Sequence, residues 1–367
     1  MKILFVVCSP LFPTNSGIKQ SALGRVYDAV QAGHDVEVIE VDNELKNLEP
    51  VRPSDFKNVR VHRIANESAR TFRGELAALL SMKPRYVSLF GNERICHRMN
   101  QLFGEIGPDK VVAESIWATV AIPQRYLQMT ELVVHDVLSE FFYEMARTTA
   151  SPVRRLLFAI DWVKIKGYER QLVVRDFSSY TFLTAHDRDW YIERFKLKHE
   201  NAAVATNRLF VNPVTRCTNL DEPFILFPGS IEFSQNFFAL QWYLDQVVPH
   251  LGEGFDIPIF VTGRYSDKNR SAFARYPHLR FTSEITLTQL EHLYASCLCV
   301  VSPIVSGTGI KIKVLEAAQR GIPVVATFTS AKGIESEHCY RCEDDDPRSF
   351  AHALSGCIRR QLSPVSE

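Results

Sequence analysis

The chain has 367 residues, too many for one ordinary domain but enough for two domains of about 150–200 residues, each with its own core. Lys and Arg together number 42, as do Asp and Glu, so the formal net charge is zero and no nucleic-acid partner is expected. No apolar run reaches the roughly 18–20 residues that cross a bilayer, and the short N-terminal apolar stretch favours a strand over a signal peptide. We therefore expect a soluble, cytoplasmic protein.

The first half of the chain predicts an α/β domain. Residues 2–8 form a continuous apolar run, typical of a strand buried on both faces of a parallel sheet. A loop containing Pro13 and Gly17, a helix over residues 18–32 and a strand over residues 34–42 follow, and together they make one βαβ unit. Further strands are expected at residues 59–64, 110–113, 132–135 and 180–183, with helices at 94–103 and 154–170.

An irregular stretch between residues 201 and 222 precedes a second round of the same alternation. We place the domain boundary there, with one domain over residues 1–205 and another over residues 206–367. Five short strands interleaved with helices again predict a parallel sheet in the second domain. The expected strands are 224–227, 257–262, 279–282, 298–303 and 323–327, and the expected helices are 236–251, 267–276, 287–296, 310–320 and a last one capped by Asp346 or a neighbour.

The eight cysteines are scattered, and Cys339 and Cys342 are alone in a C-x-x-C arrangement. No second pair completes a zinc site, so we interpret the cysteines as reduced thiols and expect no metal. A redox-active or metal-binding role for this pair is the alternative.

The segment 302–327 carries the strongest chemical signal. Gly307 and Gly309 follow a strand and precede a helix, where backbone N–H groups and the helix dipole attract an anion such as a diphosphate. The dipole disfavours cations in a first turn, yet Lys311 and Lys313 are both placed there. This pattern predicts an anion that the lysines neutralise.

Glu316 lies one turn further along the same helix. A carboxylate there could accept hydrogen bonds from two adjacent ribose hydroxyls better than a neutral group could. The alternative for the whole segment is a solvated first turn whose lysines face water, because glycine-rich turns between strand and helix are common.

The run GTGIKIKVLEAAQRGIPVVAT, residues 307–327, resembles the signature of the retaining glycosyltransferases of family four. The opening segment, the run FPGSIEFSQNFF, the run IFVTGR and the run VVHD at residues 133–136 are similar to other parts of that family. The resemblance covers nearly the whole chain. It implies the B-type glycosyltransferase fold, with two Rossmann-like domains whose parallel sheets face each other across a central cleft, the first binding the acceptor and the second the nucleotide-sugar donor.

The resemblance also implies site residues. It makes Glu316 the ribose-binding glutamate, Lys313 a phosphate contact and His135 a neighbour of the reacting sugar, and these are the predicted catalytic residues. Gly17 is implied in a loop facing the diphosphate. The predicted donor-binding residues are Gly17, Gly229, Ser230, Asn236, Gly263, Arg264, Gly307, Thr308, Gly309, Ile310 and Lys311.

Two departures from the family pattern concern the donor. Thr308 stands where the family has its first glutamate, which holds hydroxyls of the transferred sugar. Ser230 and Asn236 stand where the family has Arg and Lys. Arg264, at the end of the next strand, is the cation that we expect to replace them.

His135 ends a predicted strand and is followed by Asp136, at the sheet edge where open α/β sheets bind ligands. Glu114 and Trp117 end another strand at the same edge, and with Asp136 they are the predicted acceptor-binding residues. A structural histidine is the alternative for His135.

Basic and apolar residues alternate over residues 70–98 and 151–170. Such a composition could lie on an anionic membrane surface or hold an anionic acceptor. The simpler alternative is an amphipathic helix with its apolar face in the core.

Together these features predict transfer of a sugar from a nucleoside diphosphate donor to a hydroxyl acceptor, with retention if the resemblance holds. The acceptor would be a glycan, a glycolipid or a small molecule, and peripheral contact with a membrane remains open. The nucleotide sugar is a co-substrate, and no cofactor or metal is expected, since the acidic run 344–346 is explained by helix capping. The alternatives are a catalytically silent nucleotide-sugar-binding module and a nucleotide-sugar epimerase of the same fold.

Overall fold

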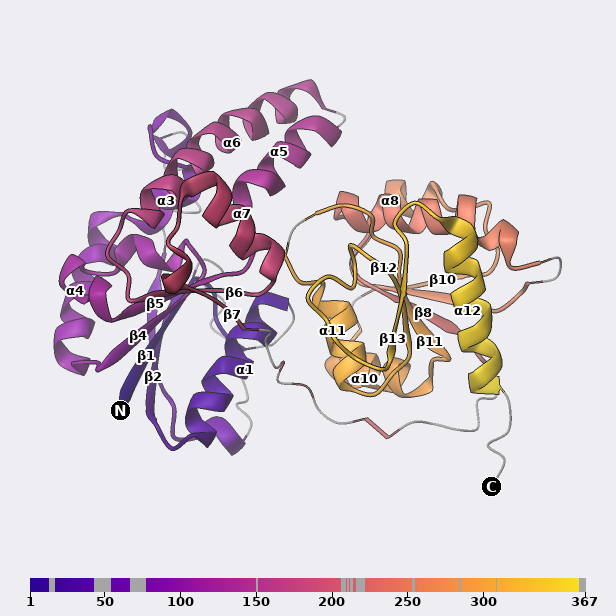
Figure 1. Ribbon diagram of the computed structural model, residues 1–367, viewed down its shortest axis with the longest axis horizontal. Helices are drawn as coiled ribbons and strands as arrows, with labels where there is room; N and C mark the ends of the chain where they lie inside the picture. Colours follow the sequence, from indigo (N-terminus) through magenta and orange to yellow (C-terminus); the bar gives the residue numbers. More distant parts are fainter. Residues whose placement is uncertain are drawn as a thin grey trace. The chain divides into compact units, whose positions relative to one another are not determined.

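The computed structural model divides the chain into two compact units, Met1–Phe210 and Val211–Glu367. It describes residues 1–12, 17–42, 54–66, 77–149, 151–205, 209, 211, 214–215, 222–252, 255–283, 285–307 and 309–362. Each unit contains one parallel sheet with helices on both faces (Figure 1). The α/β class expected for both halves is therefore confirmed.

The sheet of the first unit has seven strands in the order β3-β2-β1-β4-β5-β6-β7. Apolar residues at alternate positions, among them Leu4, Val6, Leu132 and Val134, are buried in one core, because successive side chains of a strand point to opposite faces. The chain order reverses between β1 and β4, which makes their carboxyl ends the expected ligand edge. The strands are β1 (Lys2–Val7), β2 (Asp35–Asp42), β3 (Arg60–Ala65), β4 (Lys110–Glu114), β5 (Thr130–Val134), β6 (Ser179–Phe182) and β7 (Ala202–Val204).

Local signals set the helix ends of the first unit. Asn92 caps α4 by accepting a hydrogen bond from the Ile95 amide, and Gly107 ends it in the left-handed conformation with a φ of 57°. The α-helices are α1 (Gly17–Gln31), α3 (Arg85–Phe90), α4 (Glu93–Ile106), α5 (Leu138–Thr148), α6 (Pro152–Val173) and α7 (Ala185–Phe195). The 3₁₀ turns are η1 (Ser54–Phe56), η3 (Ala118–Ala121), η4 (Gln124–Met129) and η5 (His199–Asn201).

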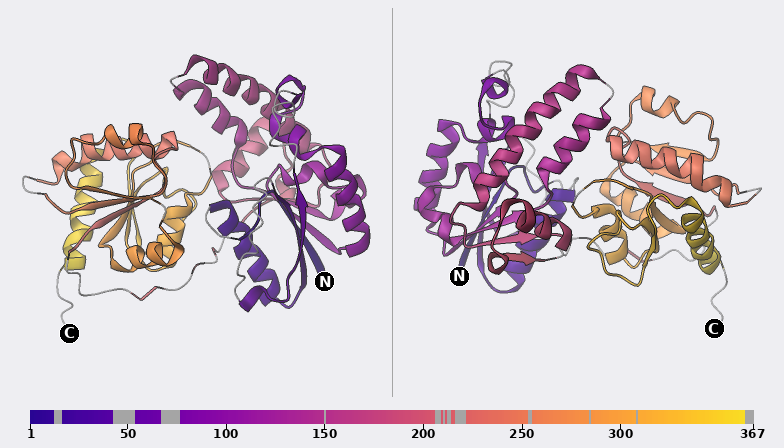
Figure 2. Two further views of the ribbon diagram at one scale, coloured as in Figure 1. Left: turned by 180° about the vertical axis from the view of Figure 1, so that it is seen from behind. Right: turned by 45° about the horizontal axis from the view of Figure 1, so that its top comes forward.

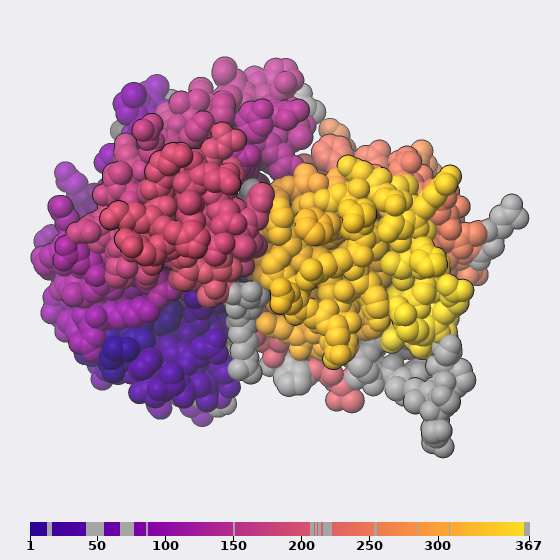
Figure 3. Space-filling view, in the orientation of Figure 1, coloured from indigo at the N-terminus to yellow at the C-terminus, as the bar shows by residue number. Residues whose placement is uncertain are grey.

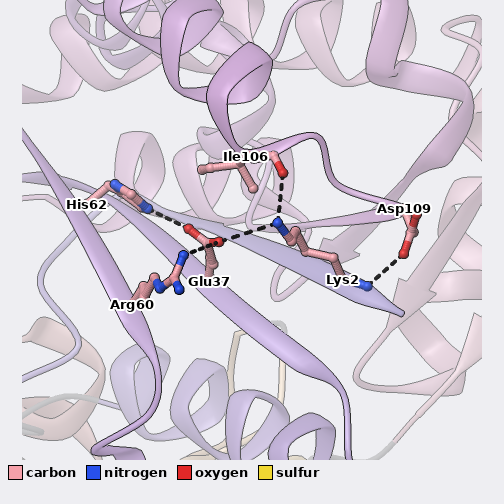
Figure 4. Close-up of polar contacts among 6 residues, drawn as sticks. All are labelled: Lys2, Glu37, Arg60, His62, Ile106 and Asp109. Carbon is pink, nitrogen blue, oxygen red and sulfur yellow. Dashed lines mark hydrogen bonds and ion pairs between the residues drawn. The ribbon is translucent and has the colours of Figure 1, made fainter.

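A polar network around Glu37 holds the amino-terminal edge of this sheet (Figure 4). The buried Glu37 carboxylate lies 2.7 Å from His62 Nε2, 3.8 Å from Lys2 Nζ and 3.7 Å from Arg60 Nη1. The backbone amide of Lys2 also donates to Asp109 Oδ2 at 2.7 Å. A buried carboxylate needs such partners, and these contacts tie β1, β2 and β3 together at the edge opposite the expected ligand edge.

The second unit has a six-stranded sheet in the order β10-β9-β8-β11-β12-β13. The expectation of five strands was wrong, because β13 is a short edge strand whose residues are mostly only half-buried and lack an apolar run. Cys339 and Cys342 lie on β13 as free cysteines, and residues three apart on a strand point to opposite faces, which argues against a shared metal or disulfide. The strands are β8 (Ile225–Pro228), β9 (Ile259–Thr262), β10 (Leu279–Thr282), β11 (Cys299–Ser302), β12 (Val324–Thr327) and β13 (Cys339–Cys342).

The helices of the second unit mostly begin where the sequence predicts. Thr286 and Gln289 form a capping box at the start of α10, and Asp346 Oδ1 accepts from the amides of Arg348 and Ser349, which confirms its capping role. The helix expected over residues 267–276 is shorter, since α9 ends at Ser271. The α-helices are α8 (Ser234–Trp242), which continues through a π-turn (Tyr243–Val247) and a 3₁₀ turn (Val248–His250), α9 (Asp267–Ser271), α10 (Leu287–Ser296), α11 (Ile312–Gln319) and α12 (Pro347–Leu362).

Candidate active site

Apart from Gly17, which begins α1 of the first unit, the predicted donor residues lie in the second unit, around the point where its strand order reverses, between β8 and β11. Open α/β sheets bind ligands at the carboxyl ends of their strands at such a point. Gly229 follows β8, while Gly307 and Gly309 lie in the loop after β11. Their φ angles of 136°, 105° and 71° belong to a region that favours glycine.

These glycines let lysine side chains approach the backbone closely. A Cβ on Gly229 would lie 3.0 Å from Lys313 Nζ and 2.9 Å from Asn236 Nδ2. A Cβ on Gly307 would lie 3.2 Å from Lys311 Nζ and 2.6 Å from the side-chain Nε2 of Gln235. Two ammonium groups therefore lie against glycine backbone at the ligand edge of the sheet.

Lys313 is half-buried in the first turn of α11. Its Nζ donates to Asn236 Oδ1 at 2.7 Å and lies 4.9 Å from the centre of the Phe227 ring. Burial, with a smaller contribution from the charge of Lys311, lowers the pKa of the Lys313 amine to about 7. Keeping the Lys313 amine charged in this setting costs free energy until an anion binds beside it.

The loop after β8 connects the remaining predicted donor residues. Asn236 Nδ2 donates to the Ser230 carbonyl at 2.8 Å, and Ser230 Oγ donates to the Arg264 carbonyl at 2.7 Å. A Cβ on Gly263 would lie 2.6 Å from the Ser230 backbone nitrogen, so only glycine fits there. The structure thus brings Ser230, Asn236, Gly263 and the exposed Arg264 together with Lys313.

Glu316 lies on the same helix, and both of its carboxylate oxygens have partners inside the unit. Tyr294 donates its hydroxyl to Oε2 at 3.2 Å, and Arg320 Nη2 pairs with Oε1 at 3.0 Å. The Arg320 guanidinium also lies 5.2 Å from the centre of the Tyr294 ring. Sequence reasoning missed Tyr294 and Arg320, although Arg320 is four residues from Glu316 on one helix face and could have been found from that spacing. Ile310 is buried, and Thr308 lies outside the described residues.

A second group of predicted residues meets in the first unit. His135 follows β5, and its Nε2 lies 3.0 Å from Oε2 of Glu114, which ends β4. Arg25, on the helix that begins at Gly17, places its Nε 3.6 Å from Glu114 Oε1. An ionised carboxylate only accepts hydrogen bonds, so an ionised Glu114 would take this bond from the His135 tautomer that carries its proton on Nε2.

Ser115, directly after Glu114, has a φ of 108°, which is uncommon for a residue other than glycine. Its amide donates to the carbonyls of Ala113 and Val133, and these bonds hold the turn. Backbone strain of this kind persists where the surroundings enforce it, and it clusters at functional sites.

The other two predicted acceptor residues are half-buried. Trp117 precedes η3 and packs against the apolar core of the first unit, while Asp136 follows His135. The carboxylate of Glu114 is turned toward His135, so its contact with an acceptor stays a prediction, as do those of Trp117 and Asp136.

In the described part of the chain, no three His, Cys, Asp or Glu side chains gather as a metal site. None of the helices described there is long and apolar enough to cross a membrane.

Comparison with known proteins agrees with this geometry. Residues 222–360 match the family described as Glycosyl transferases group 1. A Klebsiella pneumoniae protein named "Uncharacterized 44.6 kDa protein in cps region" is 26% identical over 121 residues, a match that spans 31% of this chain and 31% of that protein.

Two solved structures show the fold. Anabaena Alr3699/HepE in complex with UDP and glucose is 15% identical, with a TM-score of 0.63 over 98% of this chain and 91% of that one. The catalytic domain of Starch Synthase IV from Arabidopsis thaliana, bound to ADP and acarbose, is 12% identical, with a TM-score of 0.65 over 99% of this chain and 92% of that one. The two parallel-sheet units thus have the B-type glycosyltransferase fold.

Within that class, residues 222–360 of the second unit match the glycosyl transferases group 1 family. The identification of a glycosyltransferase from residues 307–327 is therefore confirmed.

Proposed function

We propose that the protein transfers a sugar from a nucleoside diphosphate sugar to a hydroxyl group of a glycan, a glycolipid or a small molecule. The proposal includes retention at the anomeric carbon, no requirement for a metal ion, and peripheral contact with a membrane. The observation that carries it is the Lys313 amine, which lies against Gly229 and Asn236 where the strand order reverses and has a pKa of about 7. HepE with UDP and Starch Synthase IV with ADP support a nucleoside diphosphate as the ligand.

In this reaction the bond between the anomeric carbon and the diphosphate breaks, a bond to the acceptor oxygen forms, and the acceptor hydroxyl loses its proton. The departing diphosphate gains negative charge, so groups aimed at it stabilise the transition state more than the bound donor. Lys313, Lys311 and the backbone of Gly307 are the groups that we assign to this role. Glu316 would hold the ribose, and His135 would lie beside the transferred sugar.

Calorimetric titration with UDP, ADP, GDP, their monophosphates and their sugar conjugates tests the donor site. Lys313→Ala should weaken the preferred diphosphate at least as much as the intact donor and lower turnover, while the monophosphate, which lacks the β-phosphate, should change less. Lys268→Ala, on an exposed part of the same unit, is the matched control and should bind like the wild type. If Lys313→Ala binds all three ligands as the wild type does, segment 302–327 is a scaffold turn and the proposal fails.

The same titration separates a ribose contact of Glu316 from a purely structural role. Glu316→Gln should weaken the donor about ten- to a hundred-fold, because a hydrogen bond to a charged group is worth roughly 1.5–3 kcal/mol. Tyr294→Phe removes the hydroxyl that donates to Glu316 Oε2 but leaves the charge of Glu316 in place. This variant should therefore retain donor binding.

Because Thr308 replaces the family's first glutamate, a catalytically silent nucleotide-sugar-binding module is a second candidate. A nucleotide-sugar epimerase of the same fold is a third. Incubation of the preferred nucleotide sugar without acceptor distinguishes them. A transferase releases nucleoside diphosphate slowly or only after acceptor is added, an epimerase returns an epimeric nucleotide sugar, and a silent module leaves the compound unchanged under both conditions.

A further inference from the structure

Helix α6 has two apolar faces, one of which is open to solvent. Ile165, Tyr168 and Leu172 are buried in the first unit, as expected for an amphipathic helix. Val153 and Leu156, however, are 70% and 63% exposed, and Val163, on the same face two turns further along, is 63% exposed. The helix pairs with α5 to form a hairpin that extends beyond the sheet of its unit (Figures 1 and 2).

A second exposed apolar segment lies near the same helix. Lys164 Nζ donates to the Leu79 carbonyl at 2.7 Å, which fixes residues next to Leu79 against α6. Leu80 is 76% exposed and Met82 is 93% exposed. Exposed apolar side chains therefore come from two chain segments that meet at α6.

The exposed charges of α6 are all basic. The two acidic residues of α6, Asp161 and Glu169, are buried. The exposed charged residues of α6 are Arg154, Arg155, Lys166 and Arg170. The first turn of α6 contains no acidic residue, and its dipole disfavours Arg154 in the absence of an external anion.

We propose that this surface, formed by Val153, Leu156, Val163, Leu80 and Met82 with the exposed bases of α6, docks on an anionic lipid bilayer. Exposed apolar side chains enter the interface while Arg and Lys side chains meet the headgroups, a combination typical of peripheral helices. A second copy of the same surface fits poorly, because its bases would oppose those of the first copy. In the space-filling view the hairpin lies at the surface of the first unit (Figure 3).

Sedimentation of the full chain with phosphatidylcholine vesicles, with or without phosphatidylglycerol, tests this docking. The wild type should sediment only with the anionic vesicles, and less so in high salt. The variant Arg154→Gln/Lys166→Gln/Arg170→Gln should bind about a hundredfold more weakly, since each cation contributes about 1 kcal/mol, or about fivefold. The variant Val153→Ser/Leu156→Ser/Val163→Ser should also lose binding, because it removes the exposed apolar stripe.

Matched controls come from exposed residues of the second unit. Lys268→Gln/Arg348→Gln and Leu287→Ser should sediment like the wild type. The α6 variants should keep the wild-type melting temperature and bind nucleoside diphosphate normally, so this result is independent of the donor-site proposal. The docking proposal is wrong if the wild type ignores anionic vesicles, if the α6 variants sediment as well as it does, or if polyglutamate, a soluble acidic chain, binds the surface and the vesicles do not.

Discussion

Burial beside Phe227, together with the smaller effect of the Lys311 charge, lowers the pKa of the Lys313 amine to about 7. The polar partner of Lys313 in the described part of the chain is the neutral amide of Asn236. A bound diphosphate would favour the ammonium form and return the pKa toward its usual range. Binding should therefore be coupled to uptake of a proton.

This coupling predicts the pH dependence of diphosphate binding. At pH 8 the free amine is mostly neutral while the bound amine is charged, so binding should take up close to one proton, and affinity should fall by up to about tenfold per pH unit above 7. Histidines, with an ordinary pKa of about 6.5, contribute little at that pH. Titration calorimetry in two buffers of different ionisation enthalpy measures the uptake. Lys313→Arg, whose guanidinium stays charged, should show none, and absence of uptake in the wild type contradicts the assignment.

The turnover of variants tests the roles of His135 and Glu114. His135→Ala should lower turnover by about 10²–10⁴ and leave donor affinity nearly intact, if the imidazole acts on the transferring sugar. Glu114→Gln keeps an acceptor for Nε2 but removes the charge, so we expect a smaller loss. Steady-state kinetics with parallel donor titration separates the effects. Unchanged turnover in His135→Ala would make His135 a structural residue.

At the scale of elements, strongly patterned segments could be predicted from the sequence. Helix α10, with its Thr286 cap, occupies the predicted residues 287–296, and β1 ends within one residue of its expected end. Helices α3, α5 and α7 and strands β7 and β13 were not predicted. Strand β7 has three residues and β13 lacks an apolar run, so their sheet partners rather than their own patterns define them.

The candidate site could be predicted only in part, for a similar reason. Glycines with positive φ, such as Gly229 and Gly307, and the lysines beside them follow from loop spacing and from the family resemblance. The partners Tyr294 of Glu316 and Arg25 of Glu114 come from other helices, and packing alone brings them close. The sequence left open whether the apolar residues of α6 lie on a membrane or in the core, because the pattern indicates an apolar face but not what covers it.

At the scale of the molecule, each unit has its own complete sheet and its own buried core. Gly229, Asn236 and Lys313, the residues that we assign to the diphosphate, all belong to the second unit. A ligand that binds only the folded form stabilises the cooperative unit that holds it. Diphosphate binding should thus stabilise the second unit more than the first.

Hydrogen exchange of the full chain, with and without the preferred nucleoside diphosphate, tests this uneven stabilisation. At a hundred times its dissociation constant the ligand should stabilise the second unit by about 2.7 kcal/mol, and core amides of β8, β11 and β12 should exchange about a hundredfold more slowly. Amides of β2 and β3, in the sheet of the first unit, should keep their rates. Lys313→Ala at the same ligand concentration is the control and should lose most of the protection. Equal slowing in both sheets would mean that the two units unfold as one cooperative block, and slowing confined to β2 and β3 would contradict the assignment of the diphosphate to the second unit.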